Sequence, residues 1–169
     1  MRRAAQLSVD IAACAPSAPP ARAMQDALWW EIQRRYDFTA PDPIDRSAFD
    51  GPRGAFWVAS HDGRPIGSIA LAPLDHPEVA ELDVMYVAPD HRGTGLAQAL
   101  LATLEDHARG VGIRLVRLRA GEPQPEALRF YVAAGFRPIP PFGRWAGDDT
   151  ARCFEKALGR VKGGEPGVG

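Results

Sequence analysis

The chain has 169 residues, which is enough for one domain with a hydrophobic core and short for two. Hydrophobic residues make up 46% and charged residues 24%, and 20 Lys and Arg against 21 Asp and Glu give a net charge of −1. This balance argues against nonspecific binding to nucleic acid or to an acidic membrane, and no apolar run approaches the ~18 residues of a membrane span. Polar residues interrupt the apolar stretch that an export signal would need (Gln6, Ser8 and Asp10), so we expect a cytoplasmic protein.

Helices and strands are expected to alternate along the chain. Met24, Leu28 and Ile32 recur at helical spacing after a Pro- and Ala-rich stretch, which predicts a helix that ends near Tyr36. An Asp-Gly pair between two apolar runs predicts a hairpin. Besides that helix, the expected elements are a strand at 7–13, a loop with one short helical turn at 37–52, strands at 55–60, 65–73 and 79–87, a helix at 95–110, a strand at 113–119, a helix at 124–134, and strands at 136–139 and 151–156. We expect a single domain at 1–158 and a tail without fixed structure at 159–169.

The strand at 79–87 carries two carboxylates in an alternating pattern. Side chains alternate between the two faces of a strand. The pattern therefore predicts that one face holds Val79, Glu81, Asp83, Met85 and Val87.

The segment after this strand has the composition of an anion-binding turn. The strand ends at Val87, a short loop carries Arg92 and two glycines, and an apolar helix begins at Gly95. Unpaired N–H groups and the helix dipole favour an anion at a helix N-terminus, and glycine lets phosphate oxygens approach. A dinucleotide-binding fingerprint would need Gly or Ala where Gln98 stands, and a P-loop would need a Gly-Lys-Ser/Thr ending. The remaining alternative is a tight turn that binds no ligand.

Two segments resemble the GNAT superfamily of N-acetyltransferases. Arg92, Gly95 and Ala97 match the Arg-x-x-Gly-x-Ala spacing of its acetyl-CoA motif, and Tyr131 precedes a Gly-Phe pair as in its helix-to-strand segment. The resemblance extends over residues 55–158. Within the superfamily, Gly121-x-x-Gln-Pro-Glu-Ala and the run Cys-Phe-Glu-Lys at 153–156 are similar to a small bacterial subgroup, the YsnE-like proteins.

The resemblance implies a mixed α/β fold with a mostly antiparallel sheet that splays at its centre and is flanked by helices. Coenzyme A is then expected in the splayed cleft, with its pyrophosphate on the turn and its pantetheine along the preceding strand. A backbone N–H near Val87 is expected to polarise the thioester carbonyl. The expected coenzyme-binding residues are Met85, Tyr86, Val87, Arg92, Gly93, Thr94, Gly95, Leu96, Ala97 and Gln124.

Acetyl transfer to an amine moves two protons, and each has a candidate residue. The resemblance places Tyr131 beside the coenzyme sulfur, where it would protonate the departing thiolate. Its alternative role is packing, because Ala127, Phe130 and Tyr131 form a helical stripe. Glu81 is the candidate base that accepts the amine proton, and its alternative is an ordinary surface carboxylate.

The acceptor side of the cleft is expected to include Asp83 and Trp29. One of Trp29 and Trp30 should pack in the core and the other line the acceptor pocket. Two carboxylates on one face, Glu81 and Asp83, predict a preference for cationic amines. YsnE-like relatives often carry Lys-Arg where Asp83-Val84 stand and Glu-Thr where Arg119-Ala120 stand, so the acceptors of the relatives do not carry over.

The sequence predicts an acetyl-CoA-dependent N-acetyltransferase that acts by direct attack in a ternary complex on a small-molecule or peptide amine. Two alternatives stay open, a non-catalytic acyl-CoA-binding module and a protein N-terminal or lysine acetyltransferase. The histidines show no metal-ligand grouping, so no metal is expected. We expect no nucleic-acid or membrane partner, and a monomer or a homodimer.

Overall fold

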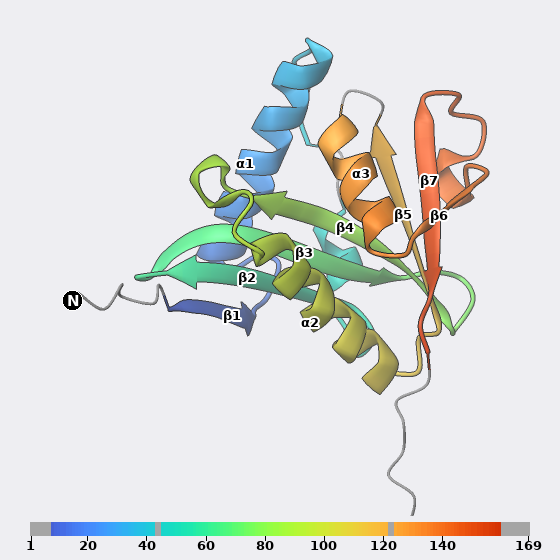
Figure 1. Ribbon diagram of the computed structural model, residues 1–169, viewed down its shortest axis with the longest axis horizontal. Coiled ribbons are helices and arrows are strands. Elements are labelled where there is room, and N and C mark those ends of the chain that lie inside the picture. The colour runs from blue at the N-terminus through green and yellow to red at the C-terminus, as the bar shows by residue number, and fades with distance from the viewer. Residues whose placement is uncertain (1–7, 43–44, 122–123, 160–169) are drawn as a thin grey trace, which may run out of the picture.

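The computed structural model describes residues 8–42, 45–121 and 124–159, which form a seven-stranded sheet flanked by helices (Figure 1). The elements are β1 (Val9–Ala13), α1 (Pro19–Tyr36), the 3₁₀ turn η1 (Arg46–Phe49), β2 (Ala55–His61), β3 (Arg64–Pro73), β4 (Val79–Val87), η2 (Pro89–His91), α2 (Leu96–Gly110), β5 (Leu115–Gly121), α3 (Pro125–Ala133), β6 (Arg137–Ile139), η3 (Gly143–Trp145) and β7 (Ala151–Ala157). Leu7, in the expected first strand, and residues 160–169 of the expected tail lie outside the described residues.

The expected elements are all present, with ends displaced by one or two residues. β5 begins two residues later than predicted because the backbone of Ile113 takes part in the C-terminal cap of α2. Gly112 has a φ of 83°, and the Ile113 N–H donates to the Ala108 carbonyl at 2.8 Å. The turns η2 and η3 were not predicted, and η3 contributes to the site described below.

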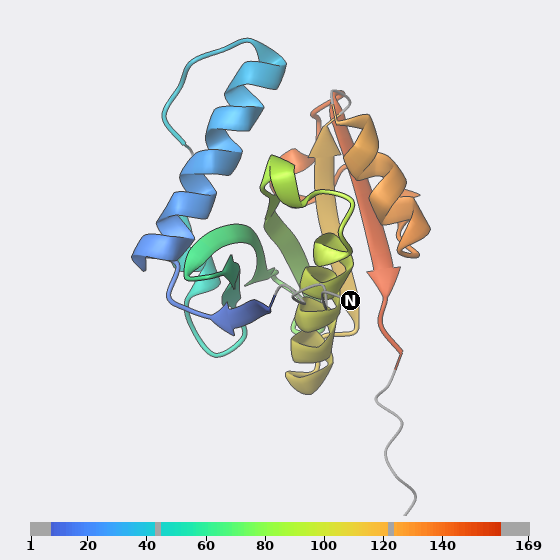
Figure 2. The same cartoon turned by 60° about the vertical axis from the view of Figure 1, so that its left-hand side comes forward.

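The sheet has the order β1-β2-β3-β4-β5-β7-β6, and every neighbouring pair except β4 and β5 is antiparallel. The parallel pairing of β4 with β5 covers only Val79–Leu115, Ala80–Val116 and Glu81–Arg117. Beyond these pairs the two strands diverge, as Figures 1 and 2 show from two directions. The mixed, mostly antiparallel and centrally splayed sheet is therefore confirmed.

Helices cover both faces of the sheet. α2 and α3 cover one face, where Leu100, Leu118 and Tyr131 belong to the larger buried cluster. α1 covers the other face, where Met24 packs in a second cluster with Phe56. The apolar periodicity of α1 and α2 thus matches two separate cores, one on each side of the sheet.

α2 lies close to the sheet at Gly67. A Cβ atom there would lie 3.0 Å from the Tyr86 carbonyl oxygen and 3.2 Å from Leu100 Cδ1. A side chain at this position would push α2 away from β3, so glycine sets the depth at which the N-terminal half of α2 packs.

β4 contains a bulge at Val84. Ala70 of β3 lies opposite Asp83, but Ser68 lies opposite Tyr86, so β4 has one extra residue over this interval. Val84 has a φ of 48°, a left-handed conformation that is rare for a β-branched residue. Such a conformation persists only where neighbouring contacts hold it.

The bulge changes which side chains share a face of β4. Met85 and Val87 pack against the cluster beneath α2, to which Leu82 also belongs. Glu81 alternates with Leu82 and lies on the opposite face. The expectation that Met85 and Val87 share a face with Glu81 is therefore wrong, because the extra residue shifts the alternation by one.

Two hydrogen bonds hold the bulge, and removing one should destabilise the protein. The buried Ser68 Oγ donates to the Val84 carbonyl at 2.8 Å, and the Val84 N–H donates to Asp83 Oδ1 at 2.7 Å. Ser68→Ala removes this donor from the carbonyl of the buried Val84, so we expect a loss of ~1–3 kcal/mol in the free energy of unfolding, measured by urea denaturation. Ser60→Ala is the matched control, because no hydrogen bond of the Ser60 hydroxyl occurs within the described residues, and its effect should stay within ~0.5 kcal/mol. Equal losses in the two variants would contradict the role given to Ser68.

Candidate active site

A cleft of about 560 Å³ opens where β4 and β5 diverge. Its walls come from β4, β5, α1, α3, η3 and the turn before α2. Figure 2 shows α1 on one side of this opening, with α3 and β7 on the other. All the expected site residues except Thr94 and Leu96 thus line one cavity.

The turn before α2 has the backbone of an anion site. Gly93 and Gly95 have φ values of 74° and 88°, and no heavy atom lies within 4 Å of a Cβ built on either. Gly95 is the N-cap of α2, and no side chain caps this helix end. The first N–H groups of α2 are therefore left for a ligand.

The six predicted turn residues have different surroundings. Arg92, Gly93, Gly95 and Ala97 line the cleft. Leu96 is 6% exposed and its side chain lies in the core, so it offers a ligand only its backbone. Thr94 is outside the cleft lining, and its hydroxyl donates to the His91 carbonyl at 2.6 Å, which stabilises the turn. The coenzyme contacts expected of these six residues stay predictions.

Arg92 is held by β4 and by α1. Its Nε donates to the Val87 carbonyl at 2.9 Å, and its Nη2 donates to Glu31 Oε2 at 2.6 Å. Glu31 also pairs with Arg35, which pairs with Glu126 of α3. This chain of charges crosses from α1 to α3 over the cleft. An anion at the turn would compete with Glu31 for Arg92.

The remaining expected coenzyme residues line the cleft as predicted. Met85, Tyr86 and Val87 follow the bulge and form the β4 wall. Gln124, the N-cap of α3, lies on the opposite wall, and its side chain makes no cap hydrogen bond. Burial, followed by the nearby Glu31 charge, raises the pKa of Tyr86.

Tyr131 projects from α3 into the cleft and is 6% exposed. Its ring makes edge contacts with Phe130 and Phe136, at centroid distances of 5.3 and 5.5 Å. Burial, followed by the Asp83 charge, raises the pKa of Tyr131 well above its usual range. The residue therefore belongs both to the packing stripe and to the cleft, and its hydroxyl keeps its proton at neutral pH.

Glu81 and Asp83 lie together in the cleft with two partners that the sequence did not reveal. Glu81 is 6% exposed, and its Oε1 accepts from Trp145 Nε1 at 2.9 Å. Arg144 Nη2 lies 3.4 Å from Glu81 Oε1 and 3.0 Å from Asp83 Oδ2. Both partners come from η3, more than sixty positions later in the chain. The acidic pair is thus not free, because one guanidinium bridges it.

The pKa of Asp83 is raised. Burial is the largest cause and the Glu81 charge adds to it, while the Val84 N–H and Arg144 act in the opposite direction. Asp83 is also turned into the cleft, not out to solvent, with its side chain 25% exposed. A carboxylate in this state is a stronger base than a solvated one.

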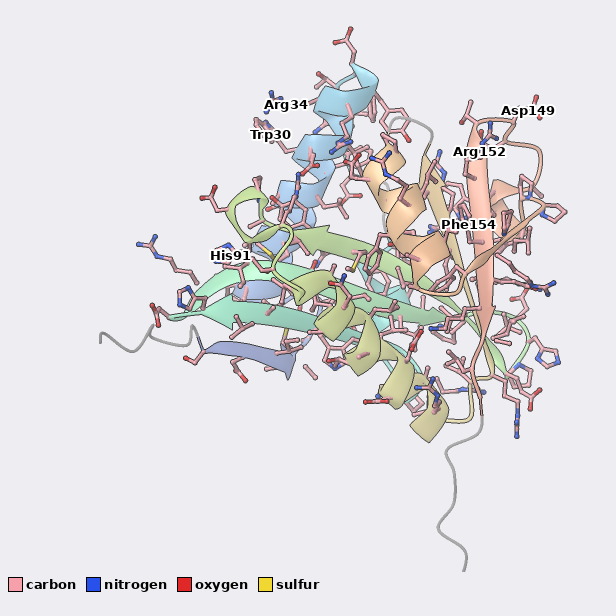
Figure 3. The ribbon with its side chains drawn as sticks, in the orientation of Figure 1. Trp30, Arg34, His91, Asp149, Arg152 and Phe154 are labelled. Atoms are coloured by element: carbon pink, nitrogen blue, oxygen red, sulfur yellow. The ribbon has the colours of Figure 1, made fainter. Side chains whose placement is uncertain are left out.

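Neither tryptophan of α1 lies in the core. Trp29 lines the cleft, and its Nε1 donates to the Ala40 carbonyl at 2.8 Å. Trp30 is 59% exposed, with the Arg34 guanidinium 4.6 Å from its ring centroid. Figure 3 shows Trp30 and Arg34 on the side of α1 that faces away from α3. The expectation that one of the two tryptophans is a core residue is wrong, because Trp29 faces the cleft and Trp30 faces outward.

The described part of the chain contains neither a membrane-spanning helix nor a metal-binding cluster. None of its helices is long and apolar enough to span a bilayer. In the same ranges, no group of three or more His, Cys, Asp and Glu side chains is placed to hold a metal ion.

Comparison with known proteins gives consistent matches. Residues 22–136 match the acetyltransferase (GNAT) family. An IAA acetyltransferase of Azospirillum brasilense is 30% identical over 115 residues, which cover 68% of this chain and 75% of that protein. Other bacterial, archaeal and mammalian N-acetyltransferases are matched over 38–64% of their own length.

Solved structures agree on the fold. A GNAT-family acetyltransferase of Staphylococcus aureus superposes with a TM-score of 0.74 at 20% identity, over 90% of this chain and all of that one. The N-acetylglutamate synthase of Neisseria gonorrhoeae, solved with coenzyme A and N-acetyl-glutamate, gives a TM-score of 0.67 at 18% identity, over 89% of this chain and 36% of that one. With the family match and the splayed sheet, these findings show that the chain belongs to the GNAT family of acetyltransferases.

Proposed function

We propose that the protein transfers the acetyl group of acetyl-CoA to a primary amine by direct attack in a ternary complex. One observation carries the proposal. A single cleft joins an uncapped, glycine-flanked helix N-terminus to a buried tyrosine and two carboxylates. The first part suits a pyrophosphate, and the second suits the two proton transfers of aminolysis. The similarity of residues 121–127 and 153–156 to YsnE-like proteins supports placing the chain in that subgroup.

The coenzyme would lie along the β4 wall of the cleft. Its pyrophosphate would bind the first N–H groups of α2 and Arg92, after Arg92 exchanges Glu31 for phosphate oxygens. Beyond Glu81, β4 no longer pairs with β5, so backbone groups on this edge can bond to the pantetheine amides as to an added strand. The backbone after the Val84 bulge would donate to the thioester carbonyl oxygen.

The reaction forms a C–N bond and breaks the C–S bond of the thioester. The neutral amine attacks the carbonyl carbon, loses one proton to a base, and leaves an amide. The thiolate leaves and takes a proton from solvent, which gives free coenzyme A. Tyr131 stays protonated because its pKa is raised, so it stabilises the departing thiolate chiefly by donating a hydrogen bond.

Glu81 is the proposed base, with Asp83 as the competing carboxylate. Trp145 and Arg144 hold Glu81 in one position, which favours a fixed proton acceptor. The pKa of Asp83 is raised mainly by burial, which favours basicity. Both side chains lie on the side of β4 away from Met85, so an amine approaching from the α1 face would meet them first.

The phosphate turn can be tested by substitution of Gly95. Gly95→Val strains a φ of 88° and fills the space left for phosphate, so binding of coenzyme A should fall below detection in calorimetry. Arg92→Ala should weaken binding by ~10-fold or more, as expected for a charge-assisted contact. Gly63→Val is the matched control, because Gly63 has a φ of 74° and open space but lies in the β2–β3 hairpin. Normal coenzyme binding by folded Gly95→Val would refute the assignment.

The variant Tyr131→Phe tests whether the Tyr131 hydroxyl acts in catalysis or the residue serves only in packing. The ring contacts with Phe130 and Phe136 remain, and only the proton donor is lost. We expect kcat to fall by ~100-fold or more with little change in coenzyme affinity, measured by release of free thiol. Tyr36→Phe, at the end of α1 and outside the cleft lining, serves as the control and should keep its kcat.

Coenzyme binding without turnover in the unmodified protein would instead favour a non-catalytic acyl-CoA-binding module.

The two carboxylates can be distinguished by their pH profiles. At low pH more of the amine is protonated, so loss of the base should slow kcat/KM most there and least at high pH. Glu81→Gln keeps an oxygen that can accept from Trp145, and it should show this pH-dependent deficit. Asp83→Asn should show a smaller deficit that is uniform across pH. The reverse pattern would transfer the role of base to Asp83.

A further inference from the structure

Arg119 of β5 faces the cleft with donors that the protein does not satisfy. Leu118 and Ala120 point into the core beneath α2, so Arg119 points to the opposite face, the one that holds Glu81. Its Nε is buried and has no hydrogen-bond partner. Its one ion pair within the described residues, to Asp148 Oδ2, is 3.6 Å long, which exceeds hydrogen-bond distance. Arg119 lines the cleft with its side chain 23% exposed, so this weakly paired guanidinium can bind an external anion.

Arg119 and Arg144 lie around the same indole ring. Their Cζ atoms are 4.9 and 4.5 Å from the centroid of Trp145. The Trp145 Nε1 donates to Glu81, so the two cations and the proposed base surround one rigid side chain. Arg144 is 51% exposed and uses only its Nη2 in the ion pairs with Glu81 and Asp83. Its other nitrogens remain available from the cleft.

This arrangement changes the expected charge of the acceptor. The carboxylates of Glu81 and Asp83 are bridged by Arg144, and Arg119 adds a second cation. Asp148, which is 35% exposed, is the acidic group that pairs with Arg119. Adjacent positive and negative groups favour a ligand that carries both charges, whereas a purely cationic amine would meet two guanidinium groups.

We infer that the acceptor is a free amino acid with an apolar side chain, whose α-carboxylate binds Arg119 and Arg144. The inference rests on the proposed function and assigns its substrate class. The carboxylate would pair with the part of the Arg119 guanidinium that is open to the cleft, and the α-amine would lie beside Glu81 and Asp83. The side chain would lie against the apolar part of α1 that lines the cleft, formed by Leu28, Trp29 and Ile32.

Matched pairs of acceptors test the carboxylate directly. Leucine, methionine and phenylalanine are each compared with their amides, which keep the amine and side chain but lack the charge. Rates of thiol release are expressed per neutral amine, because the amide has the lower amine pKa. We expect at least a ~10-fold higher kcat/KM for the acids, the effect of one charge-assisted contact. Amides turned over as fast as the acids would overturn the inference and leave the acetyltransferase proposal intact. Absence of thiol release from every amine would overturn both.

Substitution of Arg119 tests whether this residue binds the acceptor carboxylate or only holds the Trp145 ring in place. Arg119→Gln should raise KM for the acids, leave KM for the amides and for acetyl-CoA unchanged, and so abolish the preference. Arg119→Lys, which keeps the charge but not the planar fork, should retain part of it. Arg114→Gln, at the exposed start of the same strand, removes a charge outside the cleft and should preserve the preference. An equal loss for acids and amides in Arg119→Gln would show a purely structural role and overturn the inference.

Discussion

The short pairing between β4 and β5 is the constraint on which the site depends. The two strands share only three residue pairs and then separate, because their C-terminal halves pack on different partners. β4 continues along β3, and β5 continues along β7. The separation leaves backbone N–H and C=O groups facing a cavity in the middle of the sheet, where such groups are normally paired. A ligand with peptide-like amides meets that requirement, as coenzyme A does.

The bulge at Val84 divides the cleft into two chemical surfaces. Before it, Glu81 and Asp83 lie on the face covered by α1, and after it Met85 and Val87 turn towards α2. A regular strand would have put all four on one face. The extra residue therefore separates the acidic groups from the side chains that line the coenzyme wall. A buried serine and the Asp83 carboxylate hold this irregular backbone in place.

Charges in the cleft are arranged in two groups, one at each end. Near the turn, Glu31 holds Arg92 and links it through Arg35 to Glu126. At the other end, η3 brings Arg144 and Trp145 to Glu81. In both groups a charged side chain is paired within the protein but still faces the cavity, so ligand binding exchanges one ion pair for another and does not desolvate a free charge.

Local patterns in the sequence determined the elements and the turn that forms the proposed coenzyme end of the site. Helical periodicity, the Asp-Gly hairpin and the glycines beside Arg92 are properties of neighbouring residues, and they predicted α1, α2, the β2–β3 hairpin and the turn correctly. The anion-binding backbone follows from the same short segment, because both glycines with positive φ lie within it.

Tertiary structure alone decided the acceptor end. The bulge arises from the pairing of β4 with β3, which no period within β4 reveals, and it overturned the predicted face. Arg144 and Trp145 belong to a short turn whose sequence has no helical or strand periodicity. Arg119 is one of two arginines that alternate with apolar residues on β5, a pattern that any strand with one polar face shows. Their roles come from distances between segments far apart in the chain. A residue pattern sets the conformation of neighbours, but only folding sets which charges from different segments share a low-dielectric cavity.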